Sequence, residues 1–376
     1  MKIYAVGGAI RDTLMGLPVH DIDYVVVGSS VDEMIAKDFR PVGKDFPVFL
    51  HPETQAEYAL ARTERKTGQG YKGFHFHTDP SVTLEQDLER RDLTINAMAQ
   101  EVGPDGKQFG PIIDPYSGQE DLAAKVFRHV SNAFSEDPLR LLRIARFAAR
   151  FPEFRITDET MTALKTIVQS GELNALSAER IWQELARGLV ATKPMHMFQI
   201  LLNTGAAKPL LPNTLTTKLA EEPFREGLIE HYEASGNSLE ERCAITLMDL
   251  SAPEIRSWAE CVRMPIEVRD FSEIFSELKV LIDKYSKAAY QPVDVLAWFN
   301  RADVWRKPDR SQALLNLADK IGFDVSALVA AMRNAQALNT AEIIAGVEAQ
   351  DRSNGERIGS AFEAARLAAI TAVVQA

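Results

Sequence analysis

The stretch KIYAVGGAIRDTLMGLPVHDIDYVVV, residues 2–27, decides the fold of the N-terminal part of this chain. The apolar run before the glycine pair predicts a strand over residues 2–6. The segment 9–15 predicts a helix that Gly16 closes, and residues 21–27 predict a second strand. A strand, a glycine turn, a helix and a second strand in this order indicate a small α+β unit.

Two acidic side chains at the start of the second strand form the first candidate site. Residues i and i+2 of a strand point to one face, so Asp21 and Asp23 are expected to lie side by side. Neighbouring carboxylates repel each other unless a cation lies between them, and Mg²⁺ prefers carboxylate, phosphate and water oxygens. The Gly7–Gly8 turn lets backbone N–H groups approach a triphosphate, and Arg11 adds a permanent positive charge. This combination predicts nucleotidyl transfer.

Each of these motifs also has a plainer interpretation. A Gly-Gly turn alone is usually only a turn, and an Asp-x-Asp pair alone is usually a solvated strand end. Their joint spacing is much less common than either motif by itself. A dinucleotide-binding turn is excluded, because it needs three glycines on a G-x-G-x-x-G frame.

Composition places the chain among ordinary soluble globular proteins. Its 376 residues are 46% hydrophobic and 25% charged, which suffices for two or more domains. The net charge of −11 at pH 7 predicts that nucleic acid binds only at local basic patches. Cys243 and Cys261 lack a zinc or redox spacing and predict free thiols in a reducing cytosol. No signal peptide and no long apolar run is found, so we expect a cytoplasmic protein that does not bind membranes.

The pattern along the chain changes at residue 137. Before it, short strands predicted around residues 46–50, 57–61 and 94–99 alternate with turns. The glycine-rich, basic segment 62–73 between them is interpreted either as a surface linker or as a mobile lid over the substrate. After residue 137 helical periodicity takes over, and the expected breaks between helices are Pro152, Pro194, Pro209, Pro212, Pro253, Pro265 and Pro292.

Two arginine-bearing segments add candidates for nucleotide binding. Arg91 and Asn96 offer a guanidinium and a carboxamide, which suit phosphate oxygens and a ribose hydroxyl. Alone, this segment is more simply a solvated helix start whose charges pair with one another. The other segment, residues 136–150, predicts a helix with Asp137 as its cap and Pro138 at its first position.

This second helix carries a basic stripe. Arg140, Arg143 and Arg146 recur every third residue and share one face, with Leu139, Leu142 and Phe147 expected on the opposite apolar face. Such a stripe is often only a solvated surface. Because it follows a head with nucleotide-binding motifs, we expect it to neutralise a triphosphate, while Asp137 and Arg140 offer acceptors and donors to a base edge.

The motifs together resemble those of the class II bacterial CCA-adding tRNA nucleotidyltransferases, in the polymerase-β-like nucleotidyltransferase superfamily. Gly-Gly-x-x-Arg-Asp with Asp-x-Asp, Arg-Arg-Asp-x-x-x-Asn, Glu-Asp-x-x-Arg and Ser-x-Glu-Arg-Ile-x-x-Glu occur in the family's order. The match is closest over residues 1–212. The resemblance implies an α+β fold whose mixed-sheet head is followed by an all-helical neck, body and tail. The implied bounds are 1–136 for the catalytic head, 137–205 for the neck with the nucleotide-template helices, 206–310 for the body and 311–376 for the tail.

Residue by residue, the resemblance implies a set of roles. Asp21 and Asp23 would be catalytic and bind Mg²⁺, and the implied nucleotide-binding residues are Gly8, Arg11, Arg91, Asn96, Asp137, Arg140, Arg143 and Arg146. Within this set Asp137 and Arg140 would read the base of CTP or ATP, and Glu179 and Arg180 would support them. The segment 62–73 matches the family's flexible loop, which is associated with the switch from C to A addition and favours a complete CCA enzyme.

The implied activity is template-independent addition of CCA to the 3′ end of tRNA, in tRNA maturation and repair. The RNA 3′-hydroxyl would attack the α-phosphate of CTP or ATP, with Mg²⁺ bridging the reacting groups and arginines stabilising the leaving pyrophosphate. Glu57 and Glu64 are candidates for a third metal-bridging carboxylate, and the sequence singles out neither. No stable protein partner is implied.

The C-terminal part departs from many relatives, which carry a His-Asp metal phosphohydrolase domain. The segment 242–250 resembles its core but has Met248 where a histidine would stand. His231 is the only histidine after His196, and Asp249 is isolated, so a histidine-bearing metal centre cannot readily form. We expect a metal-free remnant that serves RNA binding and lacks phosphatase and cyclic phosphodiesterase activity.

Three other functions compete with this interpretation. A bacterial poly(A) polymerase shares the head motifs but usually has a longer, strongly basic C-terminal region. A non-catalytic tRNA-binding protein would have no need of both Asp21 and Asp23. An enzyme that modifies a small molecule does not need so long a helical extension.

Overall fold

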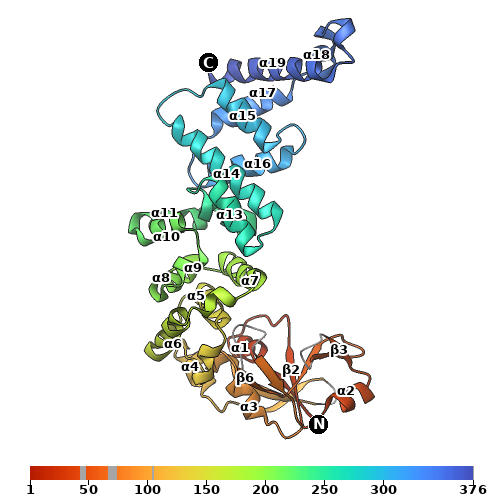
Figure 1. Cartoon of the computed structure of the whole chain (residues 1–376), viewed down its shortest axis with the longest axis vertical. Coiled ribbons are helices and arrows are strands. Elements are labelled where there is room, and N and C mark those ends of the chain that lie inside the picture. Colours follow the sequence, from red (N-terminus) through yellow and green to blue (C-terminus); the bar gives the residue numbers. More distant parts are fainter. Residues whose placement is uncertain (43–47, 67–73, 104–105, 376) are drawn as a thin grey trace. The chain divides into compact units, whose positions relative to one another are not determined.

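The structure, a computed structural model, describes residues 1–42, 48–66, 74–103 and 106–375, without the side chains of residues 64–66 and 74–76. The chain divides into two compact units, Met1–Pro209 and Leu210–Ala376 (Figure 1). The first unit contains a mixed sheet with helices, and the second is built from helices. The α+β fold class predicted from the sequence is therefore confirmed.

A seven-stranded sheet forms the base of the first unit, with the strand order β3-β4-β5-β2-β1-β8-β9. The neighbours β2 and β5 run parallel, and the other pairs are antiparallel. The strand bounds are β1 Lys2–Val6, β2 Asp23–Val27, β3 Arg40–Val42, β4 Val48–Leu50, β5 Glu57–Leu60, β8 Ala99–Val102 and β9 Gln108–Ile113.

Alternating side chains of β1 bury both faces of this sheet. Tyr4 and Val6 pack into a core with Leu84 and Leu88 of α3 (Leu84–Glu89), while Ala5 packs with α1 (Gly8–Leu14) on the other face. This period of two is the geometry of a strand that is covered on both sides. It fixes the position of the glycine turn that follows Val6.

The predictions for the head need two corrections. Residues 94–99 do not form one strand, because Thr94–Asn96 is a turn of 3₁₀ helix (η2) and β8 begins only at Ala99. The buried side chain of Thr94 donates to Asp121 Oδ2 at 2.7 Å, and that of Asn96 donates to Asp92 Oδ1 at 2.9 Å. These hydrogen bonds hold the turn. The second strand begins at Asp23, so Asp21 precedes it.

The glycine-rich segment joins two strands. β6 (Thr63–Lys66) and β7 (Phe74–His77) pair in antiparallel register from Thr63↔His77 to Lys66↔Phe74. Residues 67–73, on which the prediction of a mobile loop or lid falls, lie outside the described residues. That prediction stays open.

Helices complete the first unit, and the orange-to-green ribbons in Figure 1 show them beside the sheet. The main ones are α5 (Leu139–Arg150), α6 (Asp158–Gln169), α7 (Ala178–Leu189) and α8 (Pro194–Thr204). α5 contacts both α7 and α8. Gly188 allows α7 to approach α8 closely, since a Cβ atom there would lie 2.2 Å from the sulfur of Met197.

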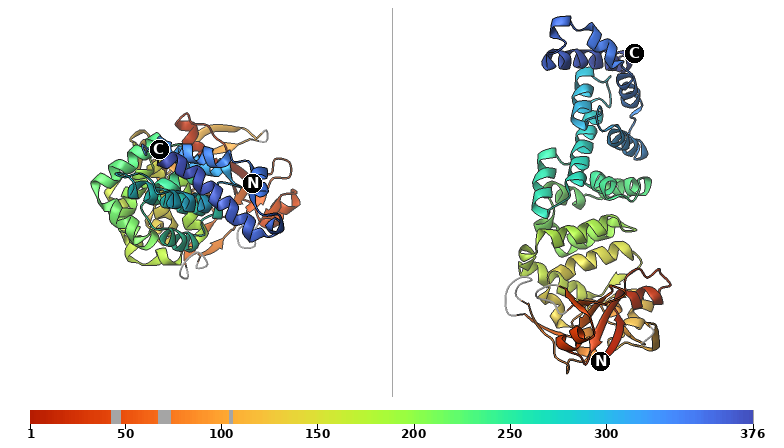
Figure 2. Two further views of the ribbon diagram at one scale, coloured as in Figure 1. Left: turned by 90° about the horizontal axis from the view of Figure 1, so that it is seen from above. Right: turned by 90° about the vertical axis from the view of Figure 1, so that its right-hand side faces the viewer.

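The second unit consists of helices throughout its described residues, as both views in Figure 2 show. Its helices are α10 Asn213–Ala220, α11 Glu222–Ala234, α12 Leu239–Leu247, α13 Ala252–Val262, α14 Ile266–Lys284, α15 Pro292–Ala302, α16 Pro308–Lys320, α17 Ser326–Gln336, α18 Thr340–Gly346 and α19 Gly355–Val374. None of the described helices of the chain has both the length and the apolar composition that a membrane span requires.

Proline begins many of these helices, which confirms the predicted breaks at those positions. Pro194 and Pro292 are the first residues of α8 and α15, and Pro212 and Pro265 precede α10 and α14. Proline is tolerated there because the first N–H groups of a helix have no partner within it.

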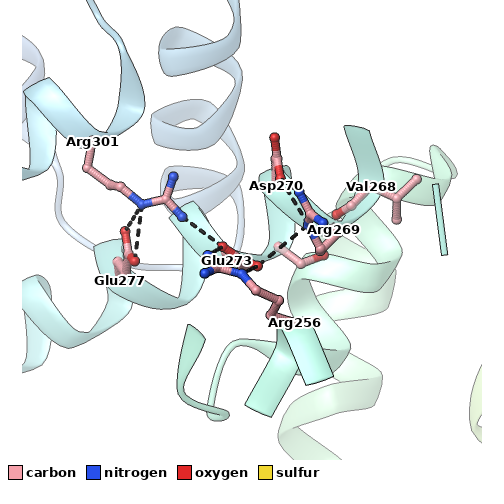
Figure 3. A network of polar contacts seen from close by, with 8 residues as sticks. Arg256, Val268, Arg269, Asp270, Glu273, Glu277 and Arg301 are labelled. Atoms are coloured by element: carbon pink, nitrogen blue, oxygen red, sulfur yellow. Dashed lines mark hydrogen bonds and ion pairs between the residues drawn. The ribbon is translucent and has the colours of Figure 1, made fainter. Parts of the chain in front are cut away.

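A polar network joins helices of the second unit (Figure 3). Glu273 of α14 is 1% exposed and accepts hydrogen bonds from Arg256 at 3.0 and 2.6 Å and from Arg301 at 2.8 Å. Arg269 lies 3.6 Å from the same carboxylate, and Arg301 also pairs with Glu277 at 3.1 Å. The single buried carboxylate therefore holds α13, α14 and α15 together.

Candidate active site

A pocket of about 490 Å³ lies within the first unit. It is formed by the glycine turn, the residues before β2, the segment after α3, and helices α5 and α7. Its lining residues are Gly7, Gly8, Arg11, Asp21, Asp23, Arg90, Arg91, Asp92, Asn96, Asp137, Arg140, Arg143, Arg146, Phe147, Arg150 and Arg187. All ten residues proposed from the sequence as catalytic, metal-binding or nucleotide-binding are in this set. The structure brings them together, and their individual roles stay predictions.

The glycine turn brings the backbone close to an arginine. Gly7 has a φ of 73° and donates its N–H to the carbonyl of Met98 at 3.1 Å. A Cβ atom at Gly7 would lie 2.8 Å from Nη1 of Arg91. The positive φ favours glycine at this position, and α1 starts at the next residue, Gly8.

The two acidic residues are open. Asp21 and Asp23 are exposed, and neither side chain forms a hydrogen bond or an ion pair with another described residue. They also line a second pocket of about 730 Å³ together with Glu57. Open carboxylates that face a pocket suit a hard cation. Among the described residues, however, no group of three His, Cys, Asp or Glu side chains is arranged to hold a metal ion.

Glu57 stands next to these acids because of the strand register. β2 and β5 pair in parallel with Tyr24 opposite Tyr58, and the two rings stack with centroids 4.5 Å apart. The preceding residues, Asp23 and Glu57, therefore point to one side of the sheet. The side chain of Glu64, the other candidate, lies outside the described residues.

A network of polar and aromatic contacts connects α1, the helix after the glycine turn, to α5. Arg11 is 3% exposed, donates to Asn96 Oδ1 at 2.6 Å and to Asp12 Oδ1 at 2.8 Å, and packs between the rings of Phe147 and Phe151. Burial lowers the pKa of Arg11, and Asp12 opposes this shift. Because its side chain is enclosed in this way, Arg11 supports the pocket wall.

Asp92 continues the network. It accepts from Asn96 at 2.9 Å and from Arg143 Nε at 2.7 Å. Burial opposes the charge of Asp92, but the Coulombic attraction of Arg143 and the hydrogen bonds from Asn96 and Arg143 outweigh it and hold the pKa well below its usual range. Asp92 therefore stays ionised at neutral pH and anchors Arg143.

A second buried acid, Asp87, holds the arginine pair. Asp87 is 0% exposed and accepts from Arg90 at 3.1 and 3.2 Å, while Arg91 Nη2 lies 3.5 Å from its other oxygen. It also accepts the backbone N–H of Arg62, at the base of the β6–β7 hairpin, at 3.3 Å. Burial opposes the charge of Asp87, but Arg90, Arg91 and Arg62 outweigh it and lower the pKa.

The start of α5 differs by one residue from the prediction. The helix begins at Leu139, and Asp137 Oδ1 accepts the N–H of that residue at 3.0 Å. Arg140 is 8% exposed and donates to the carbonyls of Ala133, at 3.2 Å, and Arg90. Two backbone carbonyl groups therefore hold the guanidinium in place.

The basic stripe is also held by acids. Arg146 pairs with Glu184 of α7 at 2.5 Å, and Arg180 lies 3.6 Å from Asp137. Phe147 was predicted on the opposite apolar face, and this was wrong. It lines the pocket under Arg146, whose guanidinium lies 4.4 Å from the ring centroid. Residues seven apart on a helix share a face, so Phe147 belongs with Arg140.

Sequence reasoning missed several lining residues, among them Arg90, Arg150 and Arg187. Arg150 lies seven residues after Arg143 and pairs with Asp12 at 3.0 Å. The helical period extends the stripe of α5 to Arg150 and could have identified it. Arg187 could be found only once α7 was known to face the pocket.

In the second unit, Asp249 is paired with lysine. Lys279 Nζ lies 3.2 Å and Lys218 Nζ 3.6 Å from its carboxylate. Burial opposes the charge of Lys279, but Asp283 and Asp249 outweigh it and raise the pKa. Met248 is buried next to Asp249, and Nδ1 of His231 is buried without a hydrogen-bond partner among the described residues. This donor set does not fit a metal ion.

Residues 3–128 match the family described as the poly A polymerase head domain. Residues 153–216 match the family described as the probable RNA and SrmB-binding site of polymerase A. The first match covers the sheet and its helices, and the second covers α6, α7 and α8.

Solved structures of CCA-adding enzymes have the same fold. An apo form matches 98% of this chain and 88% of its own with a TM-score of 0.67 at 22% identity. The Thermotoga maritima enzyme complexed with tRNA matches 100% of this chain and 88% of its own, also with a TM-score of 0.67 at 22% identity. A complex of a CCA-adding enzyme with CTP matches 98% and 87% with a TM-score of 0.65 at 23% identity.

Curated relatives are more similar in sequence. The multifunctional CCA protein of Burkholderia cenocepacia is 44% identical over 409 aligned residues, which cover 98% of each chain. That of Paraburkholderia phymatum is 44% identical over 392 residues, covering 94% of this chain and 93% of its own. The chain belongs to the multifunctional CCA protein family, which confirms the resemblance drawn from its motifs.

Proposed function

We propose that the protein adds CCA to the 3′ end of tRNA, using CTP and ATP and releasing pyrophosphate. The observation that carries this proposal is one pocket in which two open carboxylates, Asp21 and Asp23, face eight arginine side chains. Arginines match the charge of a triphosphate and of an RNA end. Similar solved enzymes are described as complexes with tRNA, CTP and ATP, which supports these substrates here.

We infer that Mg²⁺ is the metal and that Asp21 and Asp23 hold it. Family members are nucleotidyltransferases, which generally depend on a divalent metal. When bound, such an ion activates the RNA hydroxyl and neutralises charge that develops on the phosphates. The two carboxylates are open and need no rearrangement of the protein to accept a cation. Glu57, which points to the same side of the sheet as Asp23, is a candidate for an additional oxygen ligand.

The other residues of the pocket have different proposed tasks. Gly8 and Arg91 contact the triphosphate, while buried Arg11 acts through Asn96, which it orients toward the sugar. Arg143 and Arg146, which are already paired with acids, hold the positive wall beside the phosphates.

We propose that Asp137 and Arg140 read the base. Arg140 is held by two backbone carbonyls, which give its guanidinium group a defined direction. Arg180 holds the carboxylate of Asp137 from α7. A rigid pair of donors and acceptors selects a base edge without a nucleic-acid template.

We also propose the four-part organisation with head 1–136, neck 137–205, body 206–310 and tail 311–376. The head and neck would make up the first compact unit, whose last residue is Pro209, and the body and tail the second. Lys279 and Lys218 occupy the position beside Asp249 where a metal would need further ligands. The second unit would then serve RNA binding without metal-dependent phosphohydrolase activity.

Primer extension tests the proposed function directly. The protein is incubated with Mg²⁺ and tRNA that lacks its 3′ CCA, with CTP and ATP supplied separately and together, and products are sized at single-nucleotide resolution. Growth by three nucleotides that then stops supports the proposal. Growth by two indicates a CC-adding enzyme, a long A ladder indicates a poly(A) polymerase, and no growth indicates a tRNA-binding protein; each of these three results would contradict it.

The base-reading role is tested by Arg140→Ala. We expect the discrimination of CTP and ATP against UTP and GTP to fall at least about tenfold in kcat/KM, because the pocket loses a fixed hydrogen-bond donor. An equal loss for all four nucleotides would count against base reading at this residue.

A further inference from the structure

One face of α7 points toward the pocket. Arg180, Glu184 and Arg187 stand at positions i, i+4 and i+7 of this helix and therefore share a face. Glu184 is paired with Arg146 at 2.5 Å, and Arg180 lies 3.6 Å from Asp137. Glu184 is thus engaged with α5, and Arg180 with Asp137, which precedes that helix.

Arg187, the third residue of this face, differs from the other two. It lines the pocket, is exposed, and has no hydrogen bond or ion pair with a described residue. The seven other arginines of the pocket each have such a partner, whether a carboxylate, an amide or a backbone carbonyl. The charge of Arg187 is therefore left for a ligand, and a guanidinium presents five N–H donors in a plane that matches a phosphate.

The helix segment that carries Arg187 is held in place by its neighbours. Gly188, the next residue, lies against Met197 of α8, where a Cβ atom would come within 2.2 Å of the sulfur. The ion pair of Glu184 holds the same helix against α5. An arginine on a fixed helix loses less freedom on binding than one on a loop does.

We propose that Arg187 binds a backbone phosphate of the RNA primer near its 3′ end. This inference rests on the proposed function, in which the pocket receives both a nucleotide and an RNA end. Arg187 is exposed at the pocket and lies in the segment 153–216 that matches an RNA-binding family, whereas Arg140, Arg143 and Arg146 lie outside that segment. The same chemistry could serve the triphosphate of the nucleotide, and the experiment separates these two sources.

The test measures the affinity for tRNA lacking CCA as a function of KCl concentration. For Arg187→Ala we expect about tenfold weaker binding near physiological salt, since one charge-assisted contact is lost. The slope of log K against log salt should become shallower by about 0.7 to 0.9, the value for one phosphate. The KM for CTP should stay within about twofold of the wild type. Arg187→Lys keeps the charge and should retain the salt slope while losing part of the affinity.

Arg155→Ala is the matched control, because Arg155 is exposed in the same unit and the same 153–216 segment but outside the pocket. A raised KM for CTP with unchanged tRNA affinity would assign the contact to the triphosphate and overturn the proposal. Equal tRNA affinity and equal salt dependence in Arg187→Ala and Arg155→Ala would also overturn the proposal. Failure of the proposed function would look different, because the wild-type protein itself would then not extend the tRNA.

Discussion

The candidate active-site pocket of the first unit and the Glu273 network of the second use the same residue types in opposite ways. In the network, Arg256, Arg269 and Arg301 converge on one carboxylate that is 1% exposed. In the pocket, eight arginines line a cavity in which Asp21 and Asp23 keep their carboxylates open. Arginine content therefore does not tell a binding site from a structural contact.

The burial and pairing of the carboxylates distinguish the pocket from the structural network. A carboxylate that is buried and surrounded by guanidinium groups joins helices, and removal of one partner leaves uncompensated charge. Carboxylates that stay open while nearby arginines are held by other groups are available to a cation and its ligand. The pocket contains both kinds, because Asp92 is buried and paired whereas Asp23 is not.

The largest expected effect concerns the open acids. Asp23→Asn should lower the rate of nucleotide addition by at least about 10³-fold, because a neutral amide is a poor ligand for Mg²⁺. The free energy of unfolding should stay within about 0.5 kcal/mol of wild type, since the exposed side chain of Asp23 forms no hydrogen bond or ion pair with a described residue. Single-turnover primer extension and urea denaturation measure the two quantities. Asp32→Asn, an exposed acid of α2 (Val31–Ala36), is the control. A large loss of stability in Asp23→Asn would contradict the contrast between the open carboxylate of Asp23 and the structural carboxylate of Glu273.

The next effect concerns Asp92 and its pH dependence. Asp92→Asn should lower the free energy of unfolding by about 3 kcal/mol at pH 7, because Arg143 loses its buried anion. The folded-state pKa of Asp92 is lowered, so its stabilisation is present above the ordinary carboxyl pKa near 4 and is lost as the pH falls through the lower folded value. Urea denaturation at a series of pH values should show wild type and variant converging below about pH 4. Exposed Glu153→Gln is the control, and a difference that stays constant down to acid pH would contradict the assignment.

A smaller loss is expected for Glu273→Ala. Its arginine partners Arg256 and Arg301 are 53% and 38% exposed, so water screens much of the charge that is left behind. We expect a loss of about 2 kcal/mol, seen as a fall in Tm of roughly 4–8 °C, with the rate at saturating tRNA unchanged. Glu277→Ala, at the exposed edge of the network, should cost less than about 0.5 kcal/mol. Unchanged stability with reduced activity would reverse the proposed contrast between the two regions.

The smallest effect is expected for Asp249→Asn. Its partners Lys218 and Lys279 lie 3.6 and 3.2 Å away and are partly exposed, so the loss should be below about 1 kcal/mol. Phosphate release from a phosphomonoester in the presence of Mg²⁺, Mn²⁺ or Ni²⁺ should be at background level in both proteins. Robust release that disappears in Asp249→Asn would show a working metal centre in the second unit.

Local patterns predicted much of the pocket. The strand at residues 2–6, the glycine turn and the arginine stripe of α5 each follow from spacing within a few residues, and the structure brings them together. The predictions were wrong where contacts between residues far apart in the sequence determine the local structure. The turn Thr94–Asn96 exists because Asp121 and Asp92 bind its side chains, and the apolar character of Ile95 in the middle suggested a strand.

Arg187 shows the same limit for the site. Arg180, which is paired with Asp137, belongs to the Ser-x-Glu-Arg-Ile-x-x-Glu motif, whereas Arg187 lies outside every motif found in the sequence. Only the packing of α7 against α5 shows which of the two is left without a partner. For Phe147, the apolar side chain predicts the face opposite the arginines, whereas the helical period correctly predicts the face of Arg140.

The carboxylate of Asp12 pairs with both Arg11 and Arg150, residues that are separated by most of the first unit's chain. When residues 1–136 have emerged from the ribosome, the nascent chain contains Asp21 and Asp23. It still lacks α5 and α7, which form one side of the pocket. At roughly 5–20 residues per second, the interval until residue 187 is made lasts several seconds. During this interval the nascent chain lacks the arginines of α5 and α7 that line the pocket, so the pocket is complete only once both helices have been made.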